Sequence, residues 1–304
     1  MYLLLGDYRD PWCLSVYTML KARSLEGRII SSPLVYPSRF VWHLNNEQSE
    51  SQLWDAELPI FDNQITGVFV RSTSWIDSNG WEPADLAYTL AETQAALLGW
   101  LWSLPCPVVN RYPAAIWYRP NAPLLSWQPL LRRCSLPASE SLITNVEHEA
   151  RAFEHVSPTE GNSAVYKPLT GNVCYLLTSE EDWTGLAAVQ RYTPVCLTHA
   201  HGEAQFVCVV GERVVKGSQV SSEITLLEPA LRYFAKTIGL DFVELALAFT
   251  SKGLGVIAVE PYPCFDHFEE SARHEIIEGI VDLLTAEIDY SHKDAVHLLK
   301  RSLL

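Results

Sequence analysis

The chain has 304 residues, which is enough to bury one large hydrophobic core or two to three smaller ones. Hydrophobic residues make up 48% of the sequence and charged residues 19%, a composition typical of folded proteins and not of disordered chains. The net charge is −14 and no run of lysine and arginine occurs, which argues against a nucleic-acid partner. A bound nucleotide needs only a few local cations, so the acidity does not exclude one.

Cysteine usage and hydrophobic stretches indicate the compartment. The seven cysteines are odd in number and scattered, with no C-x-x-C pair, as expected for reduced thiols and not for a disulfide framework or a zinc site. The N-terminal residues lack the basic region and the long apolar core of a signal peptide. The longest apolar stretch, residues 95–109, is interrupted by Ser103, Pro105 and Pro107 and is too short to span a bilayer. We expect a soluble, cytoplasmic protein with no membrane partner.

Residues 1–106 predict a small α/β domain. Its expected elements, in chain order, are a strand over 2–5, a helix over 12–23, a strand at 29–30, a strand over 65–70 and a helix over 84–104 that ends at Pro105. The polar residues 45–57 predict a surface loop or an irregular helix. Arg71 follows the strand over 65–70, where it either contacts a ligand or is solvated.

Residues 107–304 predict a larger second domain. Its expected strands are 108–110, 142–145, a hairpin around Gly171, a hairpin turning at Gly211, and a pair over 242–249 and 254–259. Its expected helices are 124–134, 147–153, 178–189, 228–238 and 274–287, the fourth of them ended by Gly239.

Two segments of this domain are typical of nucleotide binding. Lys167 offers an ammonium group at a strand end, Pro168 stops the strand, and the amides of a tight loop at Thr170–Gly171 can face an anion. A solvated lysine is the alternative. Gln190–Pro194 is an extended connector of the kind in which backbone groups meet a base. His199 and His201 are expected on a loop, and with His267 they do not predict a metal site.

The order of these motifs resembles that of the ATP-grasp superfamily, in the branch of ribosomal S6 modification ligases and graspetide ligases. The segments that carry the resemblance are Val109-Asn110-Arg111, Arg119-Pro120, Leu136-Pro137 through Thr144-Asn145, Lys167-Pro168-Leu169-Thr170-Gly171, Gln190 through Pro194, Val209 through Val214, and Gly239-Leu240 through Pro261-Tyr262-Pro263. The resemblance implies an α/β fold. A small N-terminal domain over 1–106, similar to a pre-ATP-grasp domain, precedes a two-lobed ATP-grasp-like body over 107–304 with a hinge near 190–194.

The resemblance also implies an activity. Such enzymes use ATP and Mg²⁺ to convert a carboxylate into an acylphosphate, which an amine or a hydroxyl then attacks. Arg119 and Lys167 are expected to bind the phosphates, and Gln190 and Tyr192 to meet the base. Arg71 is expected to contact the carboxylate of a small-molecule or peptide substrate. Relatives commonly dimerise, so the resemblance implies a homodimer as well.

The sequence departs from the family's pattern at the metal. The family's Asp of the penultimate strand falls on Ala246, and the Glu and Asn of its last strand fall on Ala258 and Glu260. Arg191 takes the place of the hinge acid, and Ala204-Gln205-Phe206 that of a hairpin Asp-x-Arg. Two interpretations stay open. Either Glu260, alone or with Glu244 or Asp266, replaces the lost Mg²⁺ ligands of a divergent ligase, or the chain is a pseudoenzyme that binds a nucleotide, a peptide or a partner protein.

Overall fold

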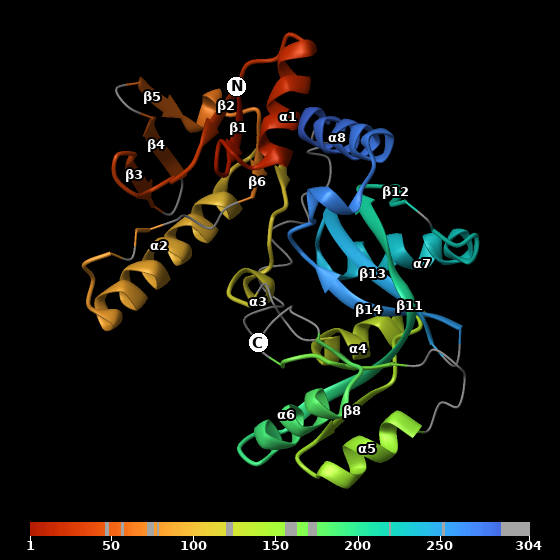
Figure 1. Ribbon diagram of the computed structural model, residues 1–304. Helices are drawn as coiled ribbons and strands as arrows, with labels where there is room; N and C mark the ends of the chain where they lie inside the picture. The colour runs from red at the N-terminus through yellow and green to blue at the C-terminus, as the bar shows by residue number, and fades with distance from the viewer. Residues whose placement is uncertain are drawn as a thin grey trace. The chain divides into compact units, whose positions relative to one another are not determined.

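The computed structural model describes residues 1–45, 49–55, 58–71, 76–77, 79–119, 124–155, 163–169, 175–218, 220–250 and 253–286 (Figure 1). The chain divides into two compact units, one formed by Met1–Val109 with Val281–Leu304 and the other by Asn110–Ile280. The sequence placed a domain boundary after residue 106 and assigned the last helix to the second domain. In the structure that helix, α8 (Glu270–Thr285), begins in the second unit and ends in the first.

The first unit contains a four-stranded parallel sheet in the order β2-β1-β6-β7. Its strands are β1 (Tyr2–Leu5), β2 (Gly27–Ile30), β6 (Gly67–Val70) and β7 (Val108–Val109). All residues of β1 and β6 are buried, which is why these short strands read as continuous apolar runs instead of alternating ones. The unit's long helices are α1 (Pro11–Ala22) and α2 (Pro83–Ser103), each with a proline in its first turn, where a missing N–H costs nothing.

A second, antiparallel sheet of the first unit corrects the expectation of a loop or an irregular helix over residues 45–57. Its strands are β3 (Arg39–Leu44), β4 (Ser49–Asp55) and β5 (Leu58–Phe61), followed by the single turn η1 (Asp62–Gln64). Ser51 and Leu53 of β4 are buried, and the indole N–H of Trp100 on α2 donates to the Ser51 hydroxyl at 2.8 Å. Glu50 and Gln52 lie on the other, more exposed face of β4, and these polar residues made the strand resemble a loop in the sequence.

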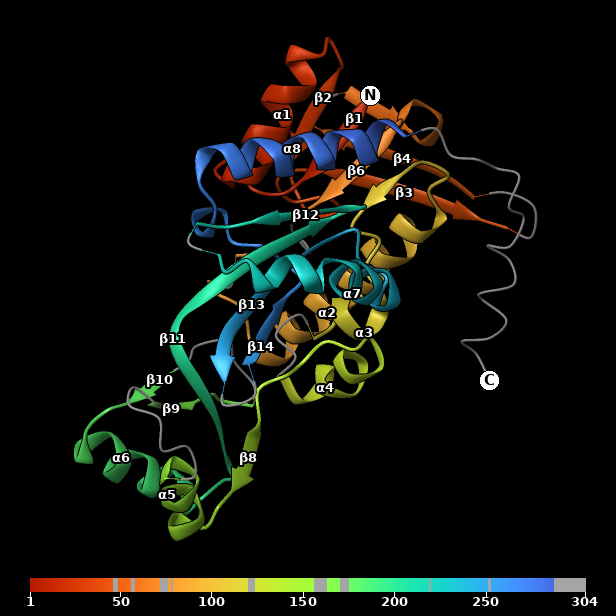
Figure 2. The same ribbon diagram turned by 90° about the vertical axis from the view of Figure 1, so that its right-hand side faces the viewer.

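The second unit is organised around one long strand. β11 (Val195–Val210) pairs through its first half with β8 and β9 and through its second half with β12 and β13, all antiparallel (Figure 2). The other strands are β8 (Ser141–Thr144), β9 (Ser163–Tyr166), β10 (Tyr175–Leu177), β12 (Arg213–Lys216), β13 (Phe242–Thr250) and β14 (Gly253–Glu260). Together they form one seven-stranded sheet whose central order is β10-β9-β11-β13-β14.

Helices cover this sheet unevenly. They are α3 (Ala114–Trp117), α4 (Leu124–Arg133), α5 (Glu147–His155), α6 (Glu180–Gln190), α7 (Glu223–Ile238) and the turn η2 (Phe265–His267). α5 and α6 pack on one face of the β8–β11–β9–β10 region, around a core that includes Phe153, Trp183 and Leu197. α7 ends at Gly239 with a φ of 72°, the left-handed cap that the sequence predicted. Among the described helices, none is both long and apolar enough to cross a membrane.

The histidine pair His199 and His201 lies within β11, which corrects the expectation of a loop. His199 is buried, its ring stacks on Phe153 with 4.0 Å between the ring centroids, and its Nε2 lies 2.8 Å from the Phe153 carbonyl oxygen. His199 is therefore a core residue, as a histidine between a sheet and its covering helix commonly is.

Candidate functional site

Lys167 lies directly after β9, as the sequence predicted. Its side chain reaches β14, the edge strand of the sheet. Its backbone N–H donates to the carbonyl of Cys196 at 2.9 Å, and its ammonium donates to the carbonyl of Ile257 at 3.1 Å. Ile257 is the extra residue of a bulge in β14, because Leu247 pairs with Val256 while Ala246 pairs with Ala258. The ammonium group thus lies beside Ala258. The predicted anion loop at Thr170–Gly171 lies outside the described residues.

The β13–β14 ladder pairs the two alanines that the resemblance places at the family's metal-ligand positions. Ala246 pairs with Ala258, and two residues along the strand Glu244 pairs with Glu260. On the other side of β13, Phe206 of β11 pairs with Ala246. Side chains of directly paired residues share one face of a sheet, so these five residues line the same face. The row Phe206–Ala246–Ala258 carries no oxygen ligand.

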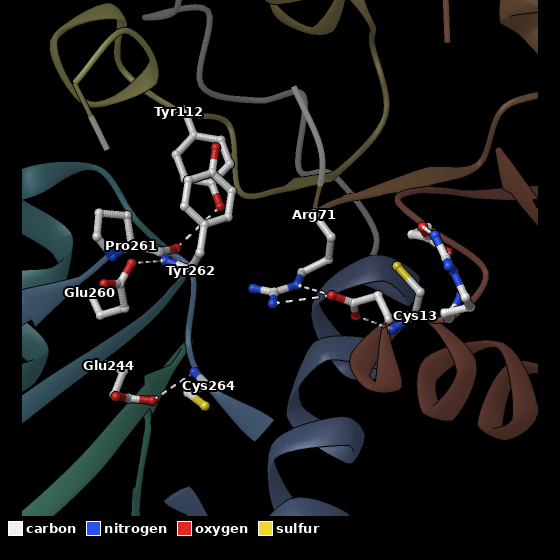
Figure 3. A network of polar contacts seen from close by, with 11 residues as sticks. Cys13, Arg71, Tyr112, Glu244, Glu260, Pro261, Tyr262 and Cys264 are labelled. Carbon is white, nitrogen blue, oxygen red and sulfur yellow. Dashed lines mark hydrogen bonds and ion pairs between the residues drawn. The ribbon is translucent and has the colours of Figure 1, made fainter. Parts of the chain in front are cut away.

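The two glutamates on this face accept hydrogen bonds from the loop that follows β14 (Figure 3). Glu244, only 2% exposed, accepts from the backbone N–H of Cys264 at 2.9 Å and from Nδ1 of His267 at 2.8 Å. Glu260 accepts from the backbone N–H of Tyr262 at 3.1 Å. Each carboxylate therefore orders the returning loop.

The donor set does not fit the Mg²⁺ that the fold family implies. Mg²⁺ requires near-octahedral oxygen coordination, with protein carboxylates supplying one or two of the ligands. Ala246 and Ala258 offer methyl groups, and Glu244 is bound to an imidazole and an amide. Within the described part of the chain, no group of three or more His, Cys, Asp or Glu side chains is arranged to hold a metal ion. Glu260, the predicted metal ligand, belongs to no such group.

The two residues predicted to meet a base differ in their surroundings. Gln190 is buried at the end of α6, and its side-chain amide donates to the carbonyl of Thr144 at 3.3 Å. Tyr192, two residues later, is 90% exposed. The connection therefore ties α6 to β8 while presenting one free aromatic ring. A role for either residue in base binding stays a prediction.

Arg119, predicted to bind phosphate, is exposed and borders an apolar cavity of about 350 Å³. The cavity is lined by residues of α3, α4 and the end of α7, among them Ile116, Trp127, Leu130 and Ile238. Neither Lys167 nor Ala258 contributes to this lining, so the structure gives no contact between Arg119 and Lys167, the two residues predicted to bind phosphate. Pro120, the second residue of the predicted pair, lies outside the described residues.

Arg71, predicted to contact a substrate carboxylate, is paired with a carboxylate of its own unit (Figure 3). Its Nε and one terminal nitrogen both donate to Asp10 Oδ2 at 3.3 Å. The other oxygen of Asp10 accepts from the N–H of Cys13 at 2.9 Å and so caps α1. Burial raises the pKa of the Cys13 thiol to about 12. A substrate carboxylate would compete with Asp10, and the substrate contact stays a prediction.

The Asp10→Ala variant is expected to lower the free energy of unfolding by about 2–3 kcal/mol. It removes the N-cap of α1, worth about 1 kcal/mol, and takes a carboxylate from the largely buried guanidinium of Arg71. Urea unfolding followed by circular dichroism measures the loss. Asp7→Ala is the matched control, because the Asp7–Arg9 ion pair is exposed and exposed ion pairs contribute little to stability. Equal losses in both variants would contradict the buried role of Asp10.

Asn110 is the residue whose importance the sequence analysis underestimated. It is fully buried, its Nδ2 donates to the carbonyl of Phe242 at 2.6 Å, and its Oδ1 accepts from the N–H groups of Asp241 and Phe242 at 2.9 and 2.7 Å. The side chain thus joins the segment after β7 to the first residue of β13. An Asn at a strand end is the only local signal, and it does not identify the partner.

Solved structures with the same architecture identify the fold. MdnC, a macrocyclase from Microcystis aeruginosa bound with precursor peptide MdnA, matches with a TM-score of 0.71 at 15% identity over 93% of this chain and 98% of that one. MdnB, a macrocyclase from the same organism, gives 0.68 at 19% identity over 94% and 99%. PsnB in complex with a minimal precursor, Mg and ADP gives 0.68 at 18% identity over 94% and 98%. The chain has the ATP-grasp ligase fold.

The resemblance inferred from the motifs is therefore confirmed for the fold. The match also includes a RimK domain ATP-grasp protein from Sphaerobacter thermophilus, with a TM-score of 0.56 at 16% identity over 94% of this chain and 99% of that one. No protein-family model and no curated protein sequence matches the chain. The chain thus shares the ATP-grasp fold over nearly its whole length at low sequence identity.

Proposed function

We propose that this ATP-grasp-fold protein is a pseudoenzyme that binds a nucleotide without Mg²⁺ and does not carry out the ligase reaction. The observation that supports it most is the direct pairing of Ala246 with Ala258, where the resemblance places two metal ligands. Acylphosphate formation depends on metal ions that bridge the phosphates and neutralise the developing charge. Methyl groups at both positions remove that contribution.

Nucleotide binding itself is supported by the face of the β8–β11–β9–β10 region opposite α5 and α6, whose central residues Cys196 and Thr198 are buried while residues of its outer strands are exposed. Ala164, Leu177 and Leu197 belong to the core under α5 and α6. Because side chains alternate along a strand, the residues next to each of them in β9, β10 and β11 lie on the opposite face. This face carries Ile143, 43% exposed, and Leu176, 55% exposed. Val165 and Lys167 alternate onto it as well. An apolar surface with a cation at its edge suits a base and its phosphates.

The test is calorimetric titration of ATP into the pure protein, once with Mg²⁺ and once with a chelator. We expect binding in both, with dissociation constants that agree within about threefold, because no carboxylate cluster among the described residues couples the metal to the nucleotide. Mg²⁺-dependent tightening of more than about tenfold, equal to about 1.4 kcal/mol, would instead favour the divergent ligase with Glu260 as a ligand. Absence of heat in both titrations would move the search to a peptide or a protein partner.

A restored metal site is the matched control. The triple variant Ala246→Asp, Ala258→Glu, Glu260→Asn places the family's three ligand types on the face that the β13–β14 ladder defines. It is expected to acquire Mg²⁺-dependent ATP binding, while the natural chain does not. Thermal melting of the variant establishes that the added carboxylates, one of them at the largely buried position 246, leave the fold intact.

A further inference from the structure

We propose that His267, held by Glu244, replaces the metal ion as the cation that contacts the phosphates of the bound nucleotide. The inference rests on the proposed nucleotide binding and goes beyond it, because it assigns a specific side chain to the position that the alanines have vacated. Two observations support it. The imidazole lies on the face of the β13–β14 ladder that carries Phe206, Ala246 and Ala258, here called the ladder face, and its two nitrogens have distinct orientations.

The placement follows from ring contacts and strand register. The His267 ring stacks on Phe206 with 3.7 Å between the ring centroids and 16° between their planes. Phe206 pairs with Ala246, which in turn pairs with Ala258. Neighbouring strands lie about 4.8 Å apart, so the row from Phe206 to Ala258 spans about 10 Å. The imidazole lies at the Phe206 end of this row, and the Lys167 ammonium lies beside its Ala258 end.

Two alanines therefore separate two groups that can carry positive charge. The methyl groups of Ala246 and Ala258 are smaller and less polar than the carboxylate side chains that the resemblance places at these two positions. A polyphosphate laid across the alanines meets Lys167 at one end and His267 at the other. Charge-assisted hydrogen bonds to phosphate need no metal, and they are about twice as strong as neutral ones.

The orientation of the imidazole is determined by Glu244. An ionised carboxylate only accepts hydrogen bonds, so Nδ1 of His267 donates to Oε1 of Glu244 at 2.8 Å. Nε2 is then the remaining ring nitrogen, and it donates to an anion only when the imidazole is protonated. The side chain of His267 is about one-third exposed, whereas that of Glu244 is almost fully buried. The buried acid orients the ring, and the ring can reach a ligand.

The loop that carries His267 is fixed in place by backbone contacts. Gly217 donates its N–H to the carbonyl of Phe206 at 2.8 Å, and a Cβ at Gly217 would lie 2.9 Å from the carbonyl oxygen of His267. Arg273 of α8 donates through Nε to the carbonyl of Phe265 at 3.1 Å, and its guanidinium lies over the Phe265 ring. The close approach allowed by the glycine keeps the imidazole on the ladder face.

The test compares metal-free ATP binding by the natural chain and its variants, measured by calorimetry with a chelator at about pH 6. His267→Gln keeps a donor for Glu244 but has no charge, and its dissociation constant is expected to rise at least about tenfold. His267→Lys restores a cation and is expected to stay within about threefold of the natural chain. His274→Gln is the control, since this exposed histidine of α8 pairs with Glu278.

The outcomes separate this inference from the function on which it rests. If the natural chain binds ATP and folded His267→Gln binds it equally well, the phosphate role of His267 is wrong while nucleotide binding stands. If His267→Gln and His267→Lys weaken binding alike, the imidazole has a structural role and the inference is again overturned. If the natural chain binds no ATP, both the proposed function and the inference fall. Thermal melting confirms that each variant is folded.

Discussion

The Asn110→Ala variant is expected to lose about 3–5 kcal/mol of unfolding free energy, the largest stability effect that the structure predicts for a single polar side chain. The substitution removes three hydrogen bonds and leaves the amides of Asp241 and Phe242 and the carbonyl of Phe242 without them, at a position where Asn110 is completely buried. Each buried group left unsatisfied costs about 1–3 kcal/mol. Urea unfolding with an unchanged m-value measures the loss.

Two further variants separate hydrogen bonding from volume. Asn110→Asp keeps the size and the acceptor oxygen but loses the donor to Phe242, so it is expected to be destabilised as well. Asn79→Ala replaces an exposed asparagine and is expected to change the free energy by less than about 0.5 kcal/mol. A loss of less than about 1 kcal/mol in Asn110→Ala would mean that water takes over the role of the side chain.

Lys167→Met is expected to weaken ATP binding by about 10- to 100-fold, the largest functional effect that the proposed site predicts. Methionine keeps the apolar stem of a side chain that is only 7% exposed and removes the ammonium group beside β14. A hydrogen bond to a charged group is worth about 1.5–3 kcal/mol, and each 1.4 kcal/mol corresponds to a factor of ten in affinity. Calorimetric titration of metal-free ATP measures the change.

The fold of Lys167→Met has to be checked because the ammonium also donates to the carbonyl of Ile257. We expect this lost bond to cost about 1 kcal/mol, which lowers the melting temperature without unfolding the protein. Lys236→Met, on an exposed position of α7, is the matched control and is expected to bind ATP as the natural chain does. Unchanged affinity in folded Lys167→Met would remove Lys167 from the nucleotide site.

The order of elements and the family of folds could be predicted from the sequence because their signals are local. Val165 and Tyr166 favour a strand, Pro168 ends it, and Gly239 allows the left-handed cap of α7. The apolar runs of β1 and β6 and the periodicity of α2 likewise depend on neighbours a few residues away. These features carried the resemblance to the ATP-grasp superfamily that the solved structures confirm as a fold.

The chemistry of the site depends on contacts that sequence spacing does not contain. Glu244 and His267 are 23 residues apart, and Arg71 and Asp10 are 61 apart, so neither pair has a local signature. The half-polar strand β4 was mistaken for a loop because its partners β3 and β5 supply the hydrogen bonds that make it a strand.

The sequence by itself thus determined the fold class and the strand-end position of Lys167, and it predicted that Ala246 and Ala258 occupy the family's metal-ligand positions. Only the tertiary structure showed that these alanines pair across β13 and β14. It also showed that the His267 ring stacks on Phe206, the neighbour of Ala246, and is hydrogen-bonded to Glu244. The physical reason is that secondary structure follows from local backbone preference and periodicity. Strand register and the pairing of buried charges instead depend on which segments, distant in the sequence, pack against each other and bury their side chains away from water.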